Sequence, residues 1–174
     1  HGEPADSSAE VAETLTLLGL VREMQGKVDA AEWALLRAHR MFAETAGAED
    51  LRSARAAGHL ARVRVCAGRF GEAEPMVLRV LPIFETQGND VDVAVTLNDL
   101  GLIRQATGAH VEAIALFERA AGHFEKAEQA QGSPIADRAT VLNNLGKSLD
   151  AIGDHQGAKV ARDRARSVGA PRKP

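Results

Sequence analysis

The stretch Leu97–Gly108, LNDLGLIRQATG, is written a second time at Leu142–Gly153, LNNLGKSLDAIG. Weaker copies stand at Leu15–Gly26 and Ala57–Gly68. In each copy a small residue is followed seven positions later by a glycine, and the four closing glycines are 42, 40 and 45 residues apart. A period of this length is typical of stacked helical hairpins rather than of one globular fold. We therefore interpret the chain as four copies of one helical hairpin.

The residues that follow each closing glycine also recur. An alanine stands five positions on in every copy, and a phenylalanine stands sixteen positions on in three of them. Small residues at fixed positions let two helices approach closely, and larger residues fill the space between successive hairpins. This pattern predicts that the second helix of each hairpin packs in the same register. The alanines are Ala31, Ala73, Ala113 and Ala158, and the phenylalanines are Phe42, Phe84 and Phe124.

Composition agrees with a helical chain of 174 residues, which is long enough to bury a core. Aromatic residues make up only 3% and tyrosine is absent, whereas strands favour aromatic and β-branched residues. The net charge of −3 gives no general attraction to nucleic acid or membrane. No apolar run approaches the roughly 20 residues of a membrane-spanning helix, and no signal peptide opens the chain. The start at His1 suggests an excised fragment or a trimmed tag.

A single cysteine, Cys66, excludes an internal disulfide, and the chain has no Cys/His cluster of the kind that holds structural zinc. We therefore expect a reducing, cytoplasmic compartment. Cys66 follows Val65 on an apolar helix face, so we expect a buried and inert thiol.

The expected domain is a single one over residues 1–174, with hairpins at about 8–47, 49–88, 90–132 and 134–168 and a frayed tail at 169–174. Ser7 or Ser8 is predicted to cap the first helix, and Asp29 the second, with Glu32 as its reciprocal partner.

Two prolines give further boundary signals. Ser133-Pro134 predicts the start of the fourth hairpin. Pro82 falls where helix interior is expected, which predicts a kink or an early end near Arg79–Leu81. The last helix, near Gln156–Val168, has Arg162 where the earlier second helices have apolar residues. It is predicted to be a polar helix that closes the array.

These residues resemble tetratricopeptide repeats, whose pattern is Leu-Gly, a glycine seven positions later, an alanine five beyond, and then Phe or Leu and Ala. The resemblance covers about residues 15–165, and its period and the phrase Leu142–Gly146 are similar to the kinesin-light-chain-type subgroup. That subgroup includes repeat regions of many bacterial transcriptional and signalling proteins, and the Ala/Arg-rich composition favours a bacterial source. The resemblance implies an all-α, right-handed α-solenoid of four hairpins and about eight helices.

The chain departs from the family pattern in two respects. Arg22, Arg64 and Arg104 stand where the family usually has an aromatic residue. We expect each arginine stem to pack and each guanidinium to reach a carboxylate such as Asp99, with anion binding as the alternative. The carboxylate clamp of chaperone-binding members is also missing, since Thr16 and Leu20 replace its polar residues, so binding of an acidic chaperone tail is not implied.

By this resemblance, the first helix of each hairpin lines a concave groove. Asn98 and Asn143 offer donors and acceptors that suit an extended peptide backbone, or they bond to neighbouring helices and fix the hairpin geometry. Basic residues in the groove could attract an acidic segment, although we favour the view that they are simply solvated. The predicted partner-binding residues are Thr16, Leu20, Arg55, Arg62, Val65, Asn98, Leu102, Gln105, Asn143 and Lys147.

Catalytic signals are missing from the sequence. It has no glycine-rich phosphate loop, no His-Glu-x-x-His and no Gly-x-Ser-x-Gly, and its histidines lack metal-ligand spacing. We expect no enzyme activity, no metal and no cofactor. The basic tail, Arg162–Lys173, has no interleaved aromatics, which argues against direct binding of nucleic acid.

The sequence therefore predicts a protein-interaction module that binds a protein or peptide in its groove, with neither nucleic acid nor membrane as a direct partner. The alternative is a regulatory or sensor domain of a larger bacterial signalling or transcriptional protein. In that case the groove holds a segment of its own chain until a ligand displaces it. The sequence carries no signal for the oligomeric state.

Overall fold

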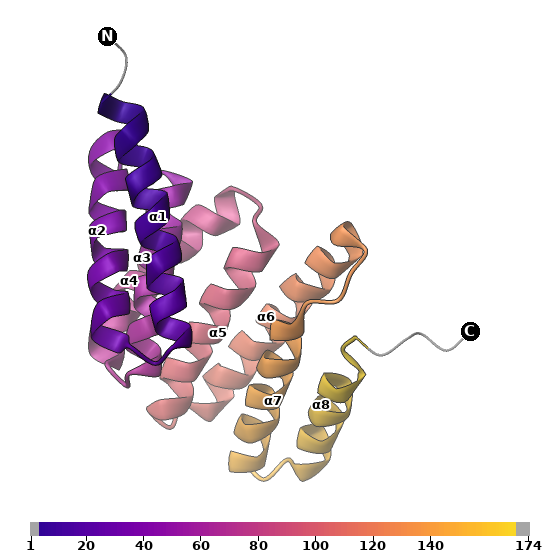
Figure 1. Ribbon diagram of the computed structural model, residues 1–174. Coiled ribbons are helices and arrows are strands. Elements are labelled where there is room, and N and C mark those ends of the chain that lie inside the picture. The colour runs from indigo at the N-terminus through magenta and orange to yellow at the C-terminus, as the bar shows by residue number, and fades with distance from the viewer. Residues whose placement is uncertain (1–3, 170–174) are drawn as a thin grey trace. The chain divides into compact units, whose positions relative to one another are not determined.

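The computed structural model describes the backbone of residues 4–169 and the side chains of residues 8–169. Over this part of the chain it contains eight helices and no strand, so the expected all-α fold class is confirmed. Figure 1 labels these helices along the chain. Apart from Gly169, the tail predicted to fray lies outside the described residues. The helices are α1 (Pro4–Met24), α2 (Val28–Ala46), α3 (Leu51–Cys66), α4 (Phe70–Thr86), α5 (Asp90–Ala106), α6 (His110–Gln131), α7 (Ala136–Ala151) and α8 (His155–Ser167).

The chain divides into two compact units of two hairpins each, His1–Gln87 with α1–α4 and Gly88–Pro174 with α5–α8. Within each unit every helix packs on the next one along the chain. The first helices of the two hairpins also meet, α1 with α3 in unit 1 and α5 with α7 in unit 2. The single domain over residues 1–174 stays a prediction.

The closing glycine of each copy ends the first helix in the same way. At Gly108, φ is +80°, a left-handed conformation that glycine adopts at little cost. The N–H of Ala109 then donates to the Arg104 carbonyl at 2.9 Å, which is the six-to-one bond of a Schellman motif. The same bond recurs after the other three closing glycines, from Lys27 to Arg22, from Arg69 to Arg64 and from Asp154 to Leu149.

The small residue seven positions before the closing glycine lets the second helix of the hairpin approach the first closely. A Cβ added at Gly101 would lie 2.5 Å from Cε1 of Phe117, and one at Gly19 would lie 2.5 Å from Cγ of Leu35. Both distances are far below van der Waals contact, so a glycine is required at these crossings.

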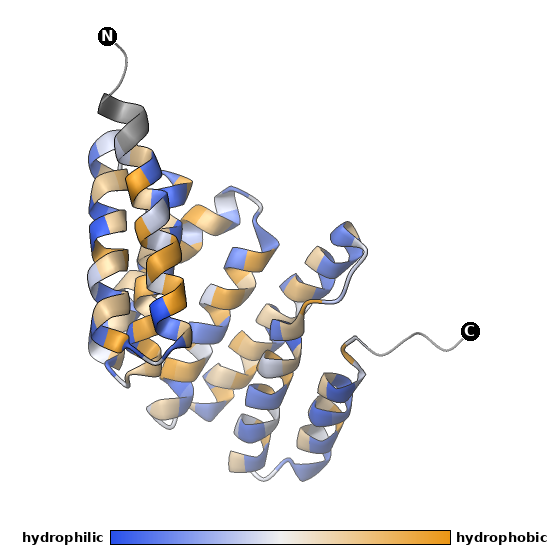
Figure 2. Cartoon of the chain, viewed as in Figure 1, coloured by the Kyte–Doolittle hydropathy of each residue, from blue (hydrophilic) through white to orange (hydrophobic). Residues whose placement is uncertain are grey.

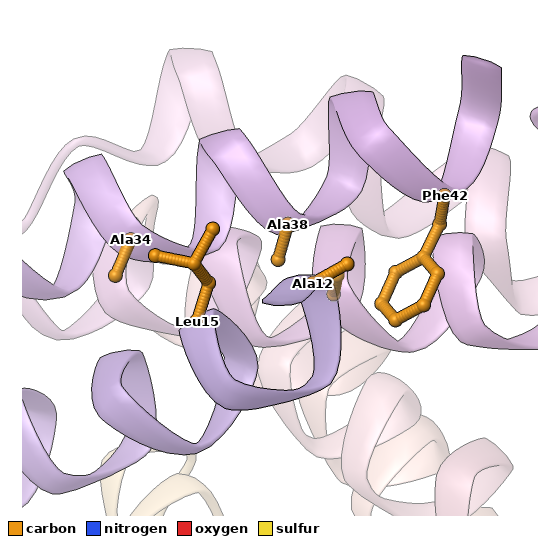
Figure 3. Packing of buried hydrophobic residues seen from close by; sticks show 6 residues of the cluster. Ala12, Leu15, Ala34, Ala38 and Phe42 are labelled. Carbon is orange, nitrogen blue, oxygen red and sulfur yellow. The ribbon is translucent and has the colours of Figure 1, made fainter. Parts of the chain in front are cut away.

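The recurring alanines and phenylalanines form the core, as their register predicts. All four alanines are 0% exposed, and the three phenylalanines are at most 2% exposed. In unit 1, Ala12 and Leu15 of α1 lie against Ala34, Ala38 and Phe42 of α2 (Figure 3).

The helix starts differ from the predicted caps. The first helix already begins at Pro4, so Ser8 lies inside it and does not cap it. Lys27 holds the N-cap position of α2 without a side-chain bond, and Asp29 lies in the first turn. The reason is the short connection after Gly26, which leaves no room for Asp29 outside the helix. There its carboxylate still interacts favourably with the helix dipole. The N-cap residue of α7 is Ile135 rather than Ser133.

Pro82 does not end α4, which continues to Thr86, so the predicted early end is wrong. Proline removes one backbone N–H donor from the helix. Pro82 is exposed, and the residue four positions earlier, Leu78, is 50% exposed, so the affected turn lies on the solvent side. Val80 and Phe84 on the other side are buried and hold the helix in place.

Candidate partner-binding surface

Four positions of each first helix share one face, because they lie 13, 10, 6 and 3 residues before the closing glycine. We call them the ladder positions and describe them within each unit separately. In unit 1 they are Glu13, Thr16, Leu20 and Glu23 of α1 with Arg55, Gly58, Arg62 and Val65 of α3. In unit 2 they are Val95, Asn98, Leu102 and Gln105 of α5 with Thr140, Asn143, Lys147 and Asp150 of α7.

In unit 2 a network of amides joins α5 to α7. Asn144 Nδ2 donates to Asn98 Oδ1 at 3.1 Å, and Gln105 Nε2 donates to Ser148 Oγ at 2.8 Å and to the Asn144 carbonyl at 3.3 Å. Lys147 Nζ lies 3.4 Å from Asn144 Oδ1. Asn144 is 6% exposed and Ser148 is 0% exposed, so these bonds satisfy polar groups that are removed from water.

The two asparagines singled out in the sequence therefore lie in different surroundings. Asn98 is half-buried and bonds to the neighbouring first helix, as its structural interpretation expects. Asn143 is exposed, as is Lys147, while Leu102 and Gln105 are half-buried.

Asn144 was missed by sequence reasoning. The pair Asn143-Asn144 could have indicated it, because successive side chains of an α-helix point about 100° apart. When Asn143 lies on the open face, Asn144 therefore points into the interface between helices.

In unit 1 an ion pair takes the place of the amides. Arg62 of α3 donates from Nε and from its terminal nitrogen to the two carboxylate oxygens of Glu23 on α1, at 2.8 and 2.7 Å. Thr16 donates to the Ala12 carbonyl of its own helix at 2.9 Å. Leu20 is half-buried and Arg55 is exposed, whereas Val65 is only 5% exposed and so offers a partner little surface.

Two of the three arginines that stand where the family usually has an aromatic residue reach a carboxylate, as expected. Arg64 Nε lies 2.7 Å from Glu32 Oε1, and Arg104 Nε lies 3.0 Å from Glu112 Oε2. Glu32 also accepts from Arg69 at 2.6 Å. Burial alone would raise the pKa of Glu32, but the hydrogen bonds from the two arginines lower it below its ordinary value. Arg22 instead donates to Gln25 Oε1 at 2.9 Å.

The role of Asp99 as an acceptor for these arginines stays a prediction. Asp99 is 3% exposed within α5. Arg64 and Arg104 contact Glu32 of α2 and the first-turn residues Glu72 of α4 and Glu112 of α6.

Among the described residues no group of three or more His, Cys, Asp or Glu side chains could hold a metal ion. Cys66 is exposed, so its expected burial is wrong. It is the last residue of α3, so its side chain lies at the end of the helix. None of the described helices is long and apolar enough to span a membrane.

Comparison with known proteins finds a family model and several solved structures that resemble this chain. The tetratricopeptide-repeat model matches residues 10–86. Among solved structures, BtubC (BKLC) from P. vanneervenii is 25% identical with a TM-score of 0.76, over 94% of this chain and 66% of BtubC. A Rap protein complexed with Competence and Sporulation Factor is 16% identical with a TM-score of 0.79, over 90% of this chain and 42% of Rap.

A putative kinesin light chain of Podosopora anserina with TPR-like repeats is 18% identical with a TM-score of 0.56, over 92% of this chain and 95% of that one. No curated protein matches the chain. The chain thus spans less than two thirds of the length of BtubC and of Rap. Residues 10–86 thus match the tetratricopeptide-repeat family, and the chain is similar in its helical-hairpin fold to these structures.

Proposed function

We propose that the chain is a protein-interaction module and that its second unit binds an extended segment of a partner along the ladder positions of α5 and α7. The observation that carries the proposal is the combination of amide, cationic and apolar side chains on these positions. Asn98 and Gln105 lie beside the half-buried Leu102 on α5, and Asn143 and Lys147 are exposed on α7.

The amides suit an extended peptide because its backbone presents N–H and C=O groups in alternation. An asparagine side chain carries one carbonyl oxygen and two N–H donors. In Asn98 the oxygen accepts from Asn144, so the structural bond and a bond to a partner use different atoms. Asn143 presents its amide to solvent, and Leu102 adds apolar contact area.

Rap supports a second candidate function, because its structure holds Competence and Sporulation Factor and the chain spans only 42% of Rap. The chain would then be a regulatory or sensor domain of a larger signalling or transcriptional protein. A bacterial and cytoplasmic setting, expected from the sequence, belongs to the same proposal.

The proposal includes no catalytic step and no direct binding of nucleic acid. Three arginines of α8 are engaged with carboxylates, which argues against a cationic surface for phosphates. Arg162 bonds to Asp150, Arg164 to Glu125 at 3.0 Å, and Arg166 to Asp163 at 2.8 Å.

The test separates the two roles of Asn98 with the substitution Asn98→Asp. Aspartate keeps an oxygen that accepts from Asn144 but loses both N–H donors. Peptides selected from a random library on the immobilised chain are the probe, and their Kd is measured by fluorescence anisotropy. Loss of one or two hydrogen bonds predicts roughly tenfold weaker binding to Asn98→Asp, with the unfolding midpoint nearly unchanged.

A matched control is Asn89→Asp in the same unit. Asn89 accepts from the Asp92 N–H at the start of α5, and aspartate caps a helix as well as asparagine does. The control makes the same change of charge away from the ladder positions, so peptide affinity should stay at the parent level. Equal affinity of Asn98→Asp and the parent would remove Asn98 from the site, and failure to select any peptide would contradict the proposal itself.

A further inference from the structure

The outer face of α1 exposes apolar side chains that its counterparts elsewhere in the chain bury. Val11, Leu17 and Val21 are 47, 64 and 48% exposed. They lie 15, 9 and 5 positions before Gly26, on one side of the helix. We call these three residues the outer face of α1. Figure 2 shows orange bands along this helix.

Of the same three register positions in α3, two are buried and the third, His59, is half-buried. Ser53 and Val63 are 0 and 1% exposed, and α3 packs on α2, the helix directly before it. The ring nitrogen Nδ1 of His39 on α2 lies 3.0 Å from Ser53 Oγ, so α2 reaches this face.

The register positions of α7 are covered in the same manner. Asn144 and Ser148 are 6 and 0% exposed, and α7 packs on α6, which directly precedes it. Arg138 of α7 pairs with Glu125 and Glu128 of α6 at 2.9 and 3.0 Å. In both units, therefore, the second helix of one hairpin packs on this face of the first helix of the next hairpin.

We propose that the outer face of α1 binds one further amphipathic helix of the same polypeptide, located before α1 in the chain and packed on it as α2 packs on α3. The covering helix in both internal examples comes directly before the helix that it covers. Buried together, three apolar side chains give a patch well below the roughly 1,200 Å² of a stable interface between separate chains. A covalent connection supplies the effective concentration that such a small patch needs.

Two further observations agree with this occupant. Two of the solved structures that the chain resembles are longer than the chain, which spans 66% of BtubC and 42% of Rap, whereas it spans 95% of the kinesin light chain structure. The last helix, α8, has a different composition, since Val160 is its one large apolar residue and its other exposed side chains are polar or charged. A helical array needs a polar helix at its ends, and α8 meets this requirement while α1 does not.

Charge gives the docking helix one more property. Glu10 and Glu13 are exposed on α1 next to Val11. A helix that carries lysine or arginine at this end would neutralise them, as Arg138 and the glutamates of α6 neutralise each other with the charges reversed. The occupant is thus a helix with an apolar stripe and a basic flank.

The test compares the complete product of the gene with residues 1–174 alone by hydrogen exchange of the amides of α1. In the complete product, α1 should exchange as slowly as α3. Leu17→Asp should speed exchange in α1 by at least about tenfold there, because the charge would be buried. In residues 1–174 alone, the same substitution should change little, since Leu17 is 64% exposed.

Leu78→Asp is the matched control, because Leu78 is 50% exposed on α4 and lies outside the outer face of α1. It should leave exchange in α1 unchanged in both proteins. Val21→Ser gives a milder disruption should Leu17→Asp prevent folding of the complete product.

Three results would overturn the proposal. One is equally fast exchange of α1 in both proteins, and another is a complete product without a helix before α1. The third is a concentration-dependent dimer of residues 1–174 that Leu17→Asp dissociates, which would assign the face to a second copy. Because peptide binding is measured in unit 2, each of these results leaves the proposed function standing.

Discussion

The substitution Gly101→Ala tests whether the recurring glycine is required by the close approach of two helices. The added Cβ would lie 2.5 Å from Cε1, 2.8 Å from Cδ1 and 3.0 Å from Cζ of Phe117, whose side chain is 0% exposed. Extra atoms in a packed core lower the free energy of unfolding by about 1–3 kcal/mol. Because the Phe117 ring is fully buried, we expect a loss near the upper end of this range. Alanine recovers about 1 kcal/mol of helix propensity. We expect a net loss of about 2 kcal/mol.

Gly122→Ala is the matched control, because Gly122 lies within α6 of the same unit and no heavy atom comes within 4 Å of its added Cβ. Alanine at such a site stabilises by about 0.4–1 kcal/mol. The two glycine-to-alanine variants should therefore differ by roughly 3 kcal/mol, or 10–20 °C in Tm for a unit of this size.

Urea unfolding followed by far-UV circular dichroism measures both variants against the parent. If Gly101→Ala proves as stable as Gly122→Ala, the steric explanation of the repeat is refuted. The double variant Gly101→Ala, Phe117→Leu extends the test, because a smaller and flexible side chain opposite Cβ should recover part of the loss. A double-mutant cycle would then show coupling between positions 101 and 117.

Two predictions concern pH. Hydrogen bonds from Arg64 and Arg69 lower the pKa of Glu32, although burial acts in the opposite direction. The ionised Glu32 therefore contributes fully to stability above its ordinary pKa of 4.5, and this contribution is lost as pH falls through the lowered pKa. Glu32→Gln should lower Tm at pH 7 and flatten the loss of stability on acidification, as measured by thermal melts between pH 7 and 3. Burial also lowers the pKa of His39, and the nearby charges of Arg79 and Arg40 lower it further. A hydrogen bond from the His39 ring to the Ser53 carbonyl acts in the opposite direction but does not cancel these effects, so the folded chain favours neutral His39. Stability should therefore be complete above pH 6.5 and fall below it, and His39→Gln should remove that part of the slope; an unchanged slope would contradict the assignment.

The periodic features of the fold were predictable from the sequence because they repeat. Each closing glycine ends a helix through the same backbone bond, and each alanine five positions on is fully buried. A repeated unit shows the same packing constraint four times, so an accidental pattern is easily distinguished from a required one. Helix type and register depend on these constraints.

Features that occur once were harder to predict. The cap of α2 is set by the length of its connection rather than by the preference of Asp29 for the N-cap. The continuation of α4 through Pro82 depends on which side of the helix faces solvent. Both are tertiary effects, which local propensities do not contain.

The helix faces that form the candidate site were predictable from the sequence, but the contacts of their side chains were not. The ladder positions follow from helical period, yet the half-buried state of Asn98 and the burial of Val65 depend on the partner helix. The choice between a structural and a binding role for Asn98 needed the position of Asn144. A sequence pattern identifies the face, and only the neighbouring helix decides which atoms stay available.

The two units fill the same register with different chemistry, and this difference favours unit 2 as the binding site. In unit 1 the carboxylate of Glu23 engages two nitrogens of the Arg62 guanidinium, so a partner must compete with a charge-assisted pair. In unit 2 the link between first helices runs through neutral amides, and the bond from Asn144 uses only the oxygen of Asn98. A neutral network resists salt, whereas an ion pair at the surface is weakened by it. Rising ionic strength should therefore loosen the contact of α1 with α3 and leave that of α5 with α7 intact, so that peptide binding by unit 2 changes little with salt.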